Sequence, residues 1–94
     1  MYRVYLCTAY DRAFAWSETR TASASAAAEA FAELVNCALW DGHELAAVLV
    51  FNQQHVAIHR FDQQPGDLAY WRGRLDRIEW HKHGAAAPRH ADAG

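Results

Sequence analysis

The chain has 94 residues, of which 52% are hydrophobic and 13% aromatic, and its formal net charge is -2 at pH 7. This length suits one small domain with a single core, and the composition excludes an intrinsically disordered chain. The net negative charge argues against non-specific nucleic-acid binding as the main task, because such binding depends on a positive field.

The cysteine count and the start of the chain bear on the compartment. Cys7 and Cys37 are too few for a disulfide framework, so we expect two reduced, largely buried thiols. The first residues are typical of a strand, and the sequence contains neither a signal peptide nor an apolar run long enough to span a membrane. We therefore expect a cytoplasmic protein with no membrane partner.

A β-hairpin is predicted at the start of the chain. Residues 2–10 alternate apolar side chains between two faces and are rich in β-forming residue types. Residues 11–12 fit a two-residue turn. Residues 13–19 then return the chain as a second strand, with Phe14 and Trp16 on one face.

An alanine-rich helix of about four turns within residues 21–42 is the clearest element of the sequence. Good helix formers fill it, Ser23 or Ser25 can cap its first turn, and Gly42 supplies its stop. Apolar side chains at helical spacing predict a stripe that faces the core. The stripe consists of Ala27, Phe31, Leu34, Val35 and Ala38.

The outer side of this helix is acidic. Glu29, Glu33 and Asp41 are expected to line its exposed face. Charge on an outer helix face is usually plain solvation, although it would also suit a basic groove.

A second hairpin is predicted after the helix. Residues 44–51 are apolar on both faces, which is typical of a central strand covered on two sides. Residues 52–54 turn the chain and residues 55–61 return it. In the returning strand, the expected faces are Val56 and Ile58 on one side and His55, Ala57 and His59 on the other.

The segment YWRGRLDRIEW, from Tyr70 to Trp80, combines three aromatic residues with three arginines. We predict a helix that begins at Asp67, its N-cap, and ends near Trp80. Its inner stripe would pack on the sheet, and its outer stripe would present the residue types that most often anchor protein interfaces. The inner stripe is Leu68, Trp71, Leu75 and Ile78. The predicted partner-binding residues are Tyr70, Arg74, Arg77 and Trp80.

Three alternatives to this interpretation stay open. Tyr70 and Trp80 can instead cover the rim of the chain's own core. Residues 77–83 can instead form a fifth strand, which would place Trp80 beside Ile78, whereas a helix would separate them. The arginines can instead meet phosphates while tryptophan stacks on bases, although two acidic residues in the same segment would repel a phosphate backbone.

The order of elements predicts the fold class. The predicted order is strand, strand, helix, strand, strand and helix. With the helices on one face of the two antiparallel hairpins, this order makes an α+β two-layer sandwich with a four-stranded antiparallel sheet. We expect residues 1–83 to form a single domain and residues 84–94 to be a disordered C-terminal tail.

No catalytic residue, cofactor or metal site is predicted. His55 and His59 share a predicted strand face, but four residues along a strand span about 13 Å, which is too far for one ion. His81 and His83 could chelate an ion from a strand but not from a helix, and we interpret the histidines as solvated surface residues. Cys7 with a distant histidine is the one nucleophile pair to name, and its apolar neighbours indicate burial rather than a reactive thiolate. We therefore expect no enzyme.

An early aromatic strand, YRVYL, and an alanine-rich SASAAAEAFAEL helix between hairpins give this short chain its format. In that format the chain resembles the small inhibitors that phages and mobile elements direct against host defence, including anti-CRISPR proteins. Such proteins bind a Cas subunit or an effector complex. The resemblance implies a non-enzymatic protein that inhibits a multi-subunit host complex by protein–protein contact, a role that the face from Tyr70 to Trp80 would suit.

Two other partners follow from the same segment. A nucleic-acid-binding accessory protein that uses residues 70–80 is the alternative function. Exposed aromatic residues would also suit pairing with a second copy of the chain.

Overall fold

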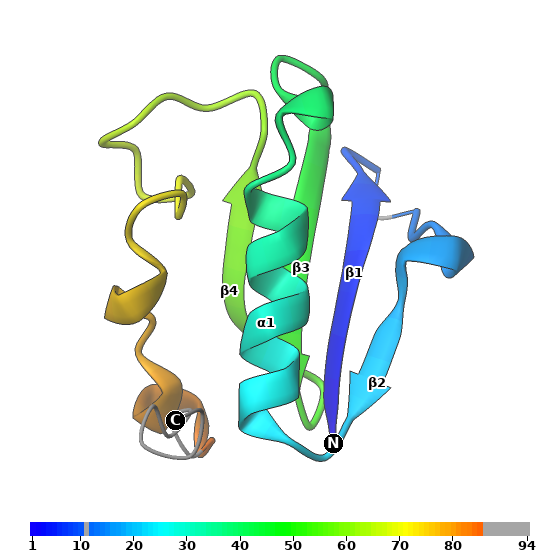
Figure 1. Ribbon diagram of the computed structural model, residues 1–94, viewed down its shortest axis with the longest axis vertical. Helices are drawn as coiled ribbons and strands as arrows, with labels where there is room; N and C mark the ends of the chain where they lie inside the picture. Colours follow the sequence, from blue (N-terminus) through cyan, green and yellow to red (C-terminus); the bar gives the residue numbers. More distant parts are fainter. Residues whose placement is uncertain (11, 86–94) are drawn as a thin grey trace.

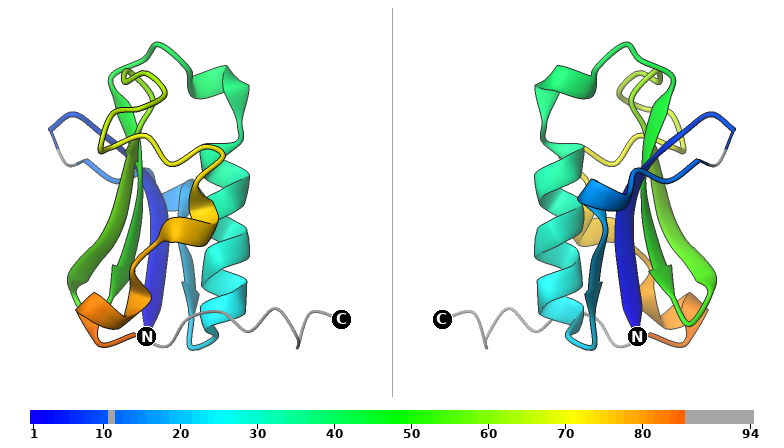
Figure 2. Two further views of the ribbon diagram at one scale, coloured as in Figure 1. Left: turned by 90° about the vertical axis from the view of Figure 1, so that its left-hand side faces the viewer. Right: turned by 90° about the vertical axis from the view of Figure 1, so that its right-hand side faces the viewer.

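The computed structural model describes residues 1–10 and 12–85. They form an α+β fold in which a four-stranded antiparallel sheet, in the order β2-β1-β3-β4, carries one helix across one face (Figures 1 and 2). The predicted fold class and the second antiparallel hairpin are confirmed, whereas the first hairpin pairs other residues than predicted. The elements are β1 (Tyr2–Thr8), β2 (Thr19–Thr21), α1 (Ala24–Val35), β3 (Leu45–Phe51) and β4 (Gln54–Arg60).

Strand β1 lies between β2 and β3 and pairs antiparallel with both. Helix α1 therefore connects two strands that run in the same direction with β1 between them. Strand β3 pairs along its whole length with β1 on one side and, through one irregularity, with β4 on the other. Its apolar side chains on both faces are explained by this central position.

The core lies between α1 and the sheet. Alternate residues of β1 and β3 point towards the helix, so Val4, Leu6 and Leu49 are fully buried against Phe31. Within the described residues, no helix covers the opposite face of the sheet, as the side views show (Figure 2). One face of the sheet is thus covered by α1, and the other is not.

Helix α1 is shorter than predicted. The Ser23 hydroxyl accepts the N–H of Ala26 at 3.1 Å, as a cap should. The helix ends at Val35 rather than near residue 42, and the backbone turns extended at Cys37. The Arg72 guanidinium satisfies the Val35 carbonyl at this end, at 2.7 and 3.0 Å. Ala38, predicted in the core stripe, is instead exposed in the 3₁₀ turn η2 (Ala38–Trp40).

The second strand of the first hairpin lies later in the chain than predicted, at Thr19–Thr21 instead of residues 13–19. Before it, Ala13 forms an isolated antiparallel bridge with Cys7, and residues 15–17 form the 3₁₀ turn η1 (Ala15–Ser17). The Ser17 hydroxyl donates to the Phe14 carbonyl at 2.6 Å, which offers the backbone an alternative to the strand ladder. Phe14 and Trp16 therefore lie in a turn and not on a strand face.

A β-bulge in β4 overturns the predicted faces of that strand. Leu49 pairs with Ala57 and Val50 with His55, so Val56 is an extra residue that shifts the alternation. His55 stays exposed on one face while His59 lies in the core, fully buried. The interpretation of the histidines as solvated surface residues is wrong for His59.

No helix forms from Asp67 to Trp80, and no fifth strand forms at residues 77–83. The segment is irregular apart from two 3₁₀ turns, η3 (Leu75–Arg77) and η4 (Trp80–His83). It runs down the outer side of β4 (Figure 1), where the Ala69 carbonyl accepts the N–H of Arg60 at 2.8 Å. Backbone groups that would form hydrogen bonds within a helix thus form them with the neighbouring strand. Gly73, at φ +81°, turns the chain.

The end of the described chain packs on the core. Ile78 and Trp80 are both buried while Glu79 between them is exposed, an alternation that an extended backbone at Ile78 produces. Ala85 is also buried. The predicted disordered tail, residues 84–94, lies outside the described residues from residue 86 onwards.

The β3–β4 turn offers a test of local backbone strain. Asn52 and Gln53 both have positive φ, +47° and +69°, a conformation that costs a non-glycine residue about 1–2 kcal/mol. Gln53→Gly should therefore raise the free energy of unfolding by about 0.5–1 kcal/mol in urea denaturation. Gln54→Gly, within β4, is the matched control and should lower it. Destabilisation by both changes would contradict this assignment of strain.

Candidate functional site

The four predicted partner-binding residues do not share an exposed face. Trp80 is only 5% exposed and its ring meets the Tyr2 ring edge-on, with centroids 5.9 Å apart. Tyr70 is half-buried against His59, at 4.9 Å between centroids. The prediction that Trp80 joins Tyr70, Arg74 and Arg77 on an outer stripe is wrong, because that stripe required a helix.

The arginines of this segment differ in what they contact. Arg72 binds the Val35 carbonyl and both carboxylate oxygens of Asp41, at 2.8 and 2.9 Å. Arg74 donates to the carbonyls of residues 67 and 70 and lies over the Trp71 ring. Arg77 alone of the three is exposed. Two of the three cations therefore hold this irregular segment in place.

His59 is the centre of a buried polar contact under the same segment. Its Nδ1 accepts the N–H of Trp71 at 2.9 Å, while Nε2 is buried without a hydrogen-bond partner. Burial, and then the nearby Arg72 charge, lower the pKa of His59 to about 4, so the ring is neutral at pH 7. The hydrogen bond from Arg72 lowers the pKa of Asp41. This cluster fastens the C-terminal segment to β4 and α1.

Two of the exposed apolar side chains, Trp16 and Leu39, indicate a different surface. Trp16 is 68% exposed, and its ring lies between those of Phe14 and Trp40, with centroids 5.8 and 6.0 Å away. Leu39, next to Trp40 in η2, is 78% exposed. We call these four residues the tryptophan patch. Trp16 and Leu39 are exposed, whereas Phe14 and Trp40 are partly buried and also pack against the core. Exposed apolar side chains mark interaction surfaces when they gather, and tryptophan is enriched among residues that dominate binding energy.

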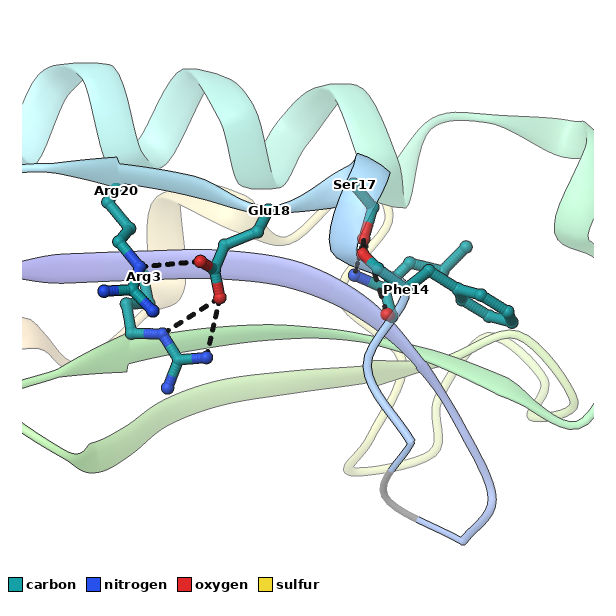
Figure 3. Close-up of polar contacts among 6 residues, drawn as sticks. Arg3, Phe14, Ser17, Glu18 and Arg20 are labelled. Atoms are coloured by element: carbon teal, nitrogen blue, oxygen red, sulfur yellow. Dashed lines mark hydrogen bonds and ion pairs between the residues drawn. The ribbon is translucent and has the colours of Figure 1, made fainter.

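The turn that carries Trp16 is held in a fixed position. Ser17 accepts the N–H of Leu6 at 2.9 Å and donates to the Phe14 carbonyl, and the Phe14 N–H binds the Leu6 carbonyl at 2.9 Å. Figure 3 shows Ser17 and Phe14 joined beside β1. Because the turn is already ordered, it would lose little conformational entropy when a partner binds to it.

A carboxylate joins the other end of this turn to the sheet. Glu18 accepts from Arg3 at 2.7 Å and from Arg20 at 2.6 Å (Figure 3). These hydrogen bonds, first from Arg3 and then from Arg20, lower the pKa of Glu18. Glu18 thus ties β1 and β2 together two residues after Trp16, which presents the indole.

The uncovered face of the sheet carries a groove of about 370 Å³. Ala46 and Val48 of β3 line it, between Tyr5 of β1 and Ile58 of β4. The Arg60 guanidinium at its rim is held by Asp62 through two hydrogen bonds, of 2.9 and 3.1 Å. The groove is thus mainly apolar, and its arginine is already paired.

Sequence reasoning missed the tryptophan patch because two distant turns build it. Trp16 and Trp40 are far apart in the chain, and their contact depends on where α1 ends. The signal available was an unusual density of aromatic residues in AFAWSE, which alternation alone assigned to a strand.

No helix of residues 1–10 and 12–85 is long and apolar enough to cross a membrane. The chain matches no protein-family model, no curated protein and no solved structure.

Proposed function

We propose that this chain is a non-enzymatic binding protein that acts through protein–protein contact, and that the tryptophan patch is its contact surface. The observation that carries this proposal is Trp16, which is ordered by its turn and yet 68% exposed. An exposed indole costs solubility without contributing much to the core, so its position favours a role in recognition.

The specific form of the proposal is inhibition of a host defence complex. It is supported by the resemblance of the chain's format to anti-CRISPR proteins, which act by binding a Cas subunit or an effector complex. The nucleic-acid alternative has less support, because Arg72 and Arg74 are engaged within the chain. Arg77 alone would offer few phosphate contacts.

The test is a phage-plaquing assay on bacterial strains that each carry a different active CRISPR–Cas system. Expression of the chain should raise plaquing in at least one strain, and Trp16→Ala should abolish the effect, because loss of a hot-spot tryptophan weakens binding by about 30-fold or more. Leu68→Ala is the control, since Leu68 is 90% exposed but outside the patch. Unchanged immunity in every strain would contradict the inhibitor form.

A further inference from the structure

The segment of the chain that contains the tryptophan patch is rich in acidic residues. Residues 13–44, which contain the whole patch, carry five acidic residues and one arginine, whereas the rest of the chain carries six acidic and eight basic residues. The chain's charge is therefore unevenly distributed, with its negative excess on the segment that includes α1 and both turns of the patch. The five acidic residues are Glu18, Glu29, Glu33, Asp41 and Glu44.

Internal ion pairs neutralise only part of this charge. Glu18 is bound by two arginines and Asp41 by Arg72. Among the ion pairs of residues 1–10 and 12–85, none includes Glu29 or Glu33, and both side chains are exposed on α1. They are four residues apart and so lie on one face of the helix, away from the sheet.

The C-terminus of α1 leads directly into η2, which carries Leu39 and Trp40. The patch therefore adjoins the helix that carries Glu29 and Glu33. The Arg72 guanidinium binds the Val35 carbonyl at this end, so the negative field comes from the two carboxylates rather than from the helix dipole.

The aromatic rings of the chain already bind arginine elsewhere. The guanidinium of Arg3 lies 5.1 Å from the Tyr5 ring centre, and that of Arg74 lies 5.1 Å from the Trp71 ring centre. Trp16 has aromatic neighbours and a largely exposed ring. An arginine from another molecule could stack on it in the same way.

We propose that the partner of the tryptophan patch presents a basic, arginine-rich segment, with an arginine stacked on Trp16 and further cations facing Glu29 and Glu33. This inference rests on the proposed binding function and names the chemistry of the partner. Electrostatic attraction of this kind would also raise the rate of association at low salt.

The test uses a fluorescein-labelled synthetic peptide of alternating arginine and leucine, with a glutamate–leucine peptide of equal length for comparison, and measures fluorescence anisotropy. The arginine peptide should bind and the glutamate peptide should not. Trp16→Ala should weaken binding by about 5- to 30-fold. The double change Glu29→Gln and Glu33→Gln should weaken it by about 3- to 10-fold at low salt and less at high salt.

Glu79→Gln is the matched control, since Glu79 is an exposed carboxylate outside residues 13–44 that pairs with Lys82. It should leave the affinity unchanged. Equal binding of both peptides, or full affinity in either the Trp16 variant or the double variant, would overturn the basic-partner inference. If the peptide test fails while Trp16→Ala still abolishes the effect on plaquing, the proposed function stands and only the partner's chemistry is wrong.

Discussion

Trp80→Ala is expected to lower the free energy of unfolding by about 3–5 kcal/mol, the usual cost of removing a large buried aromatic side chain. Trp80 is 5% exposed and lies in the same core cluster as Tyr2, Ile78 and Ala85. Residues 67–85 have no regular secondary structure beyond short turns, so this packing contributes much of what holds them to the sheet. Urea denaturation followed by far-ultraviolet circular dichroism measures the change.

Trp16→Ala is the matched control, because it removes the same side chain from an exposed position. It should cost about 1 kcal/mol, the scale of the ring contacts it loses. Equal losses for the two variants would contradict the assignment of Trp80 to the core and of Trp16 to the surface.

A second large effect is expected on acidification. The pKa of His59 is about 4 in the folded chain and about 6.5 when exposed. The unfolded chain therefore binds more protons between these values, so stability is complete above pH 6.5 and is lost as the pH falls. Linkage predicts a loss of about 2 kcal/mol between pH 7 and pH 5, and about 3 kcal/mol by pH 4.

The pH range of this loss of stability differs from the range in which protonation of the carboxylates lowers stability. Arg72 lowers the pKa of Asp41 and Arg60 lowers that of Asp62, so their contributions to stability are lost only at more acidic pH. Urea denaturation at pH 7 and pH 5 should thus report mainly on His59. His59→Phe should flatten the dependence, and an unchanged slope in that variant would refute the role of this ring.

The parts of the fold that depend on local sequence were predictable. Alternation in residues 2–8 and the apolar run of residues 45–51 identified two strands, because neighbouring strands and the helix bury the same side chains that the pattern selects. The Ser23 cap and the stripe through Phe31 placed α1. The end of α1 was not predicted, since the carbonyl of Val35 there is satisfied by Arg72, a contact with a residue far along the chain that local sequence does not reveal.

The C-terminal segment shows why periodicity alone was insufficient. Leu68, Trp71, Leu75 and Ile78 have helical spacing, yet Leu68 is 90% exposed and no helix forms. The N–H of Trp71 donates to His59, and the Ala69 carbonyl accepts the N–H of Arg60. Hydrogen bonds to residues distant in the sequence therefore replace helical ones. The buried position of Trp80 follows from extended backbone near Ile78.

The central claim is that recognition belongs to the tryptophan patch rather than to residues 70–80, and one comparison tests it most directly. The comparison uses two variants at exposed residues, Trp16→Ala and Arg77→Ala. Circular dichroism first shows that both variants fold. Each is then assayed for inhibition in a strain whose CRISPR–Cas immunity the unaltered chain blocks. We predict that Trp16→Ala loses inhibition and Arg77→Ala keeps it. Loss of inhibition in Arg77→Ala with full activity in Trp16→Ala would contradict the account.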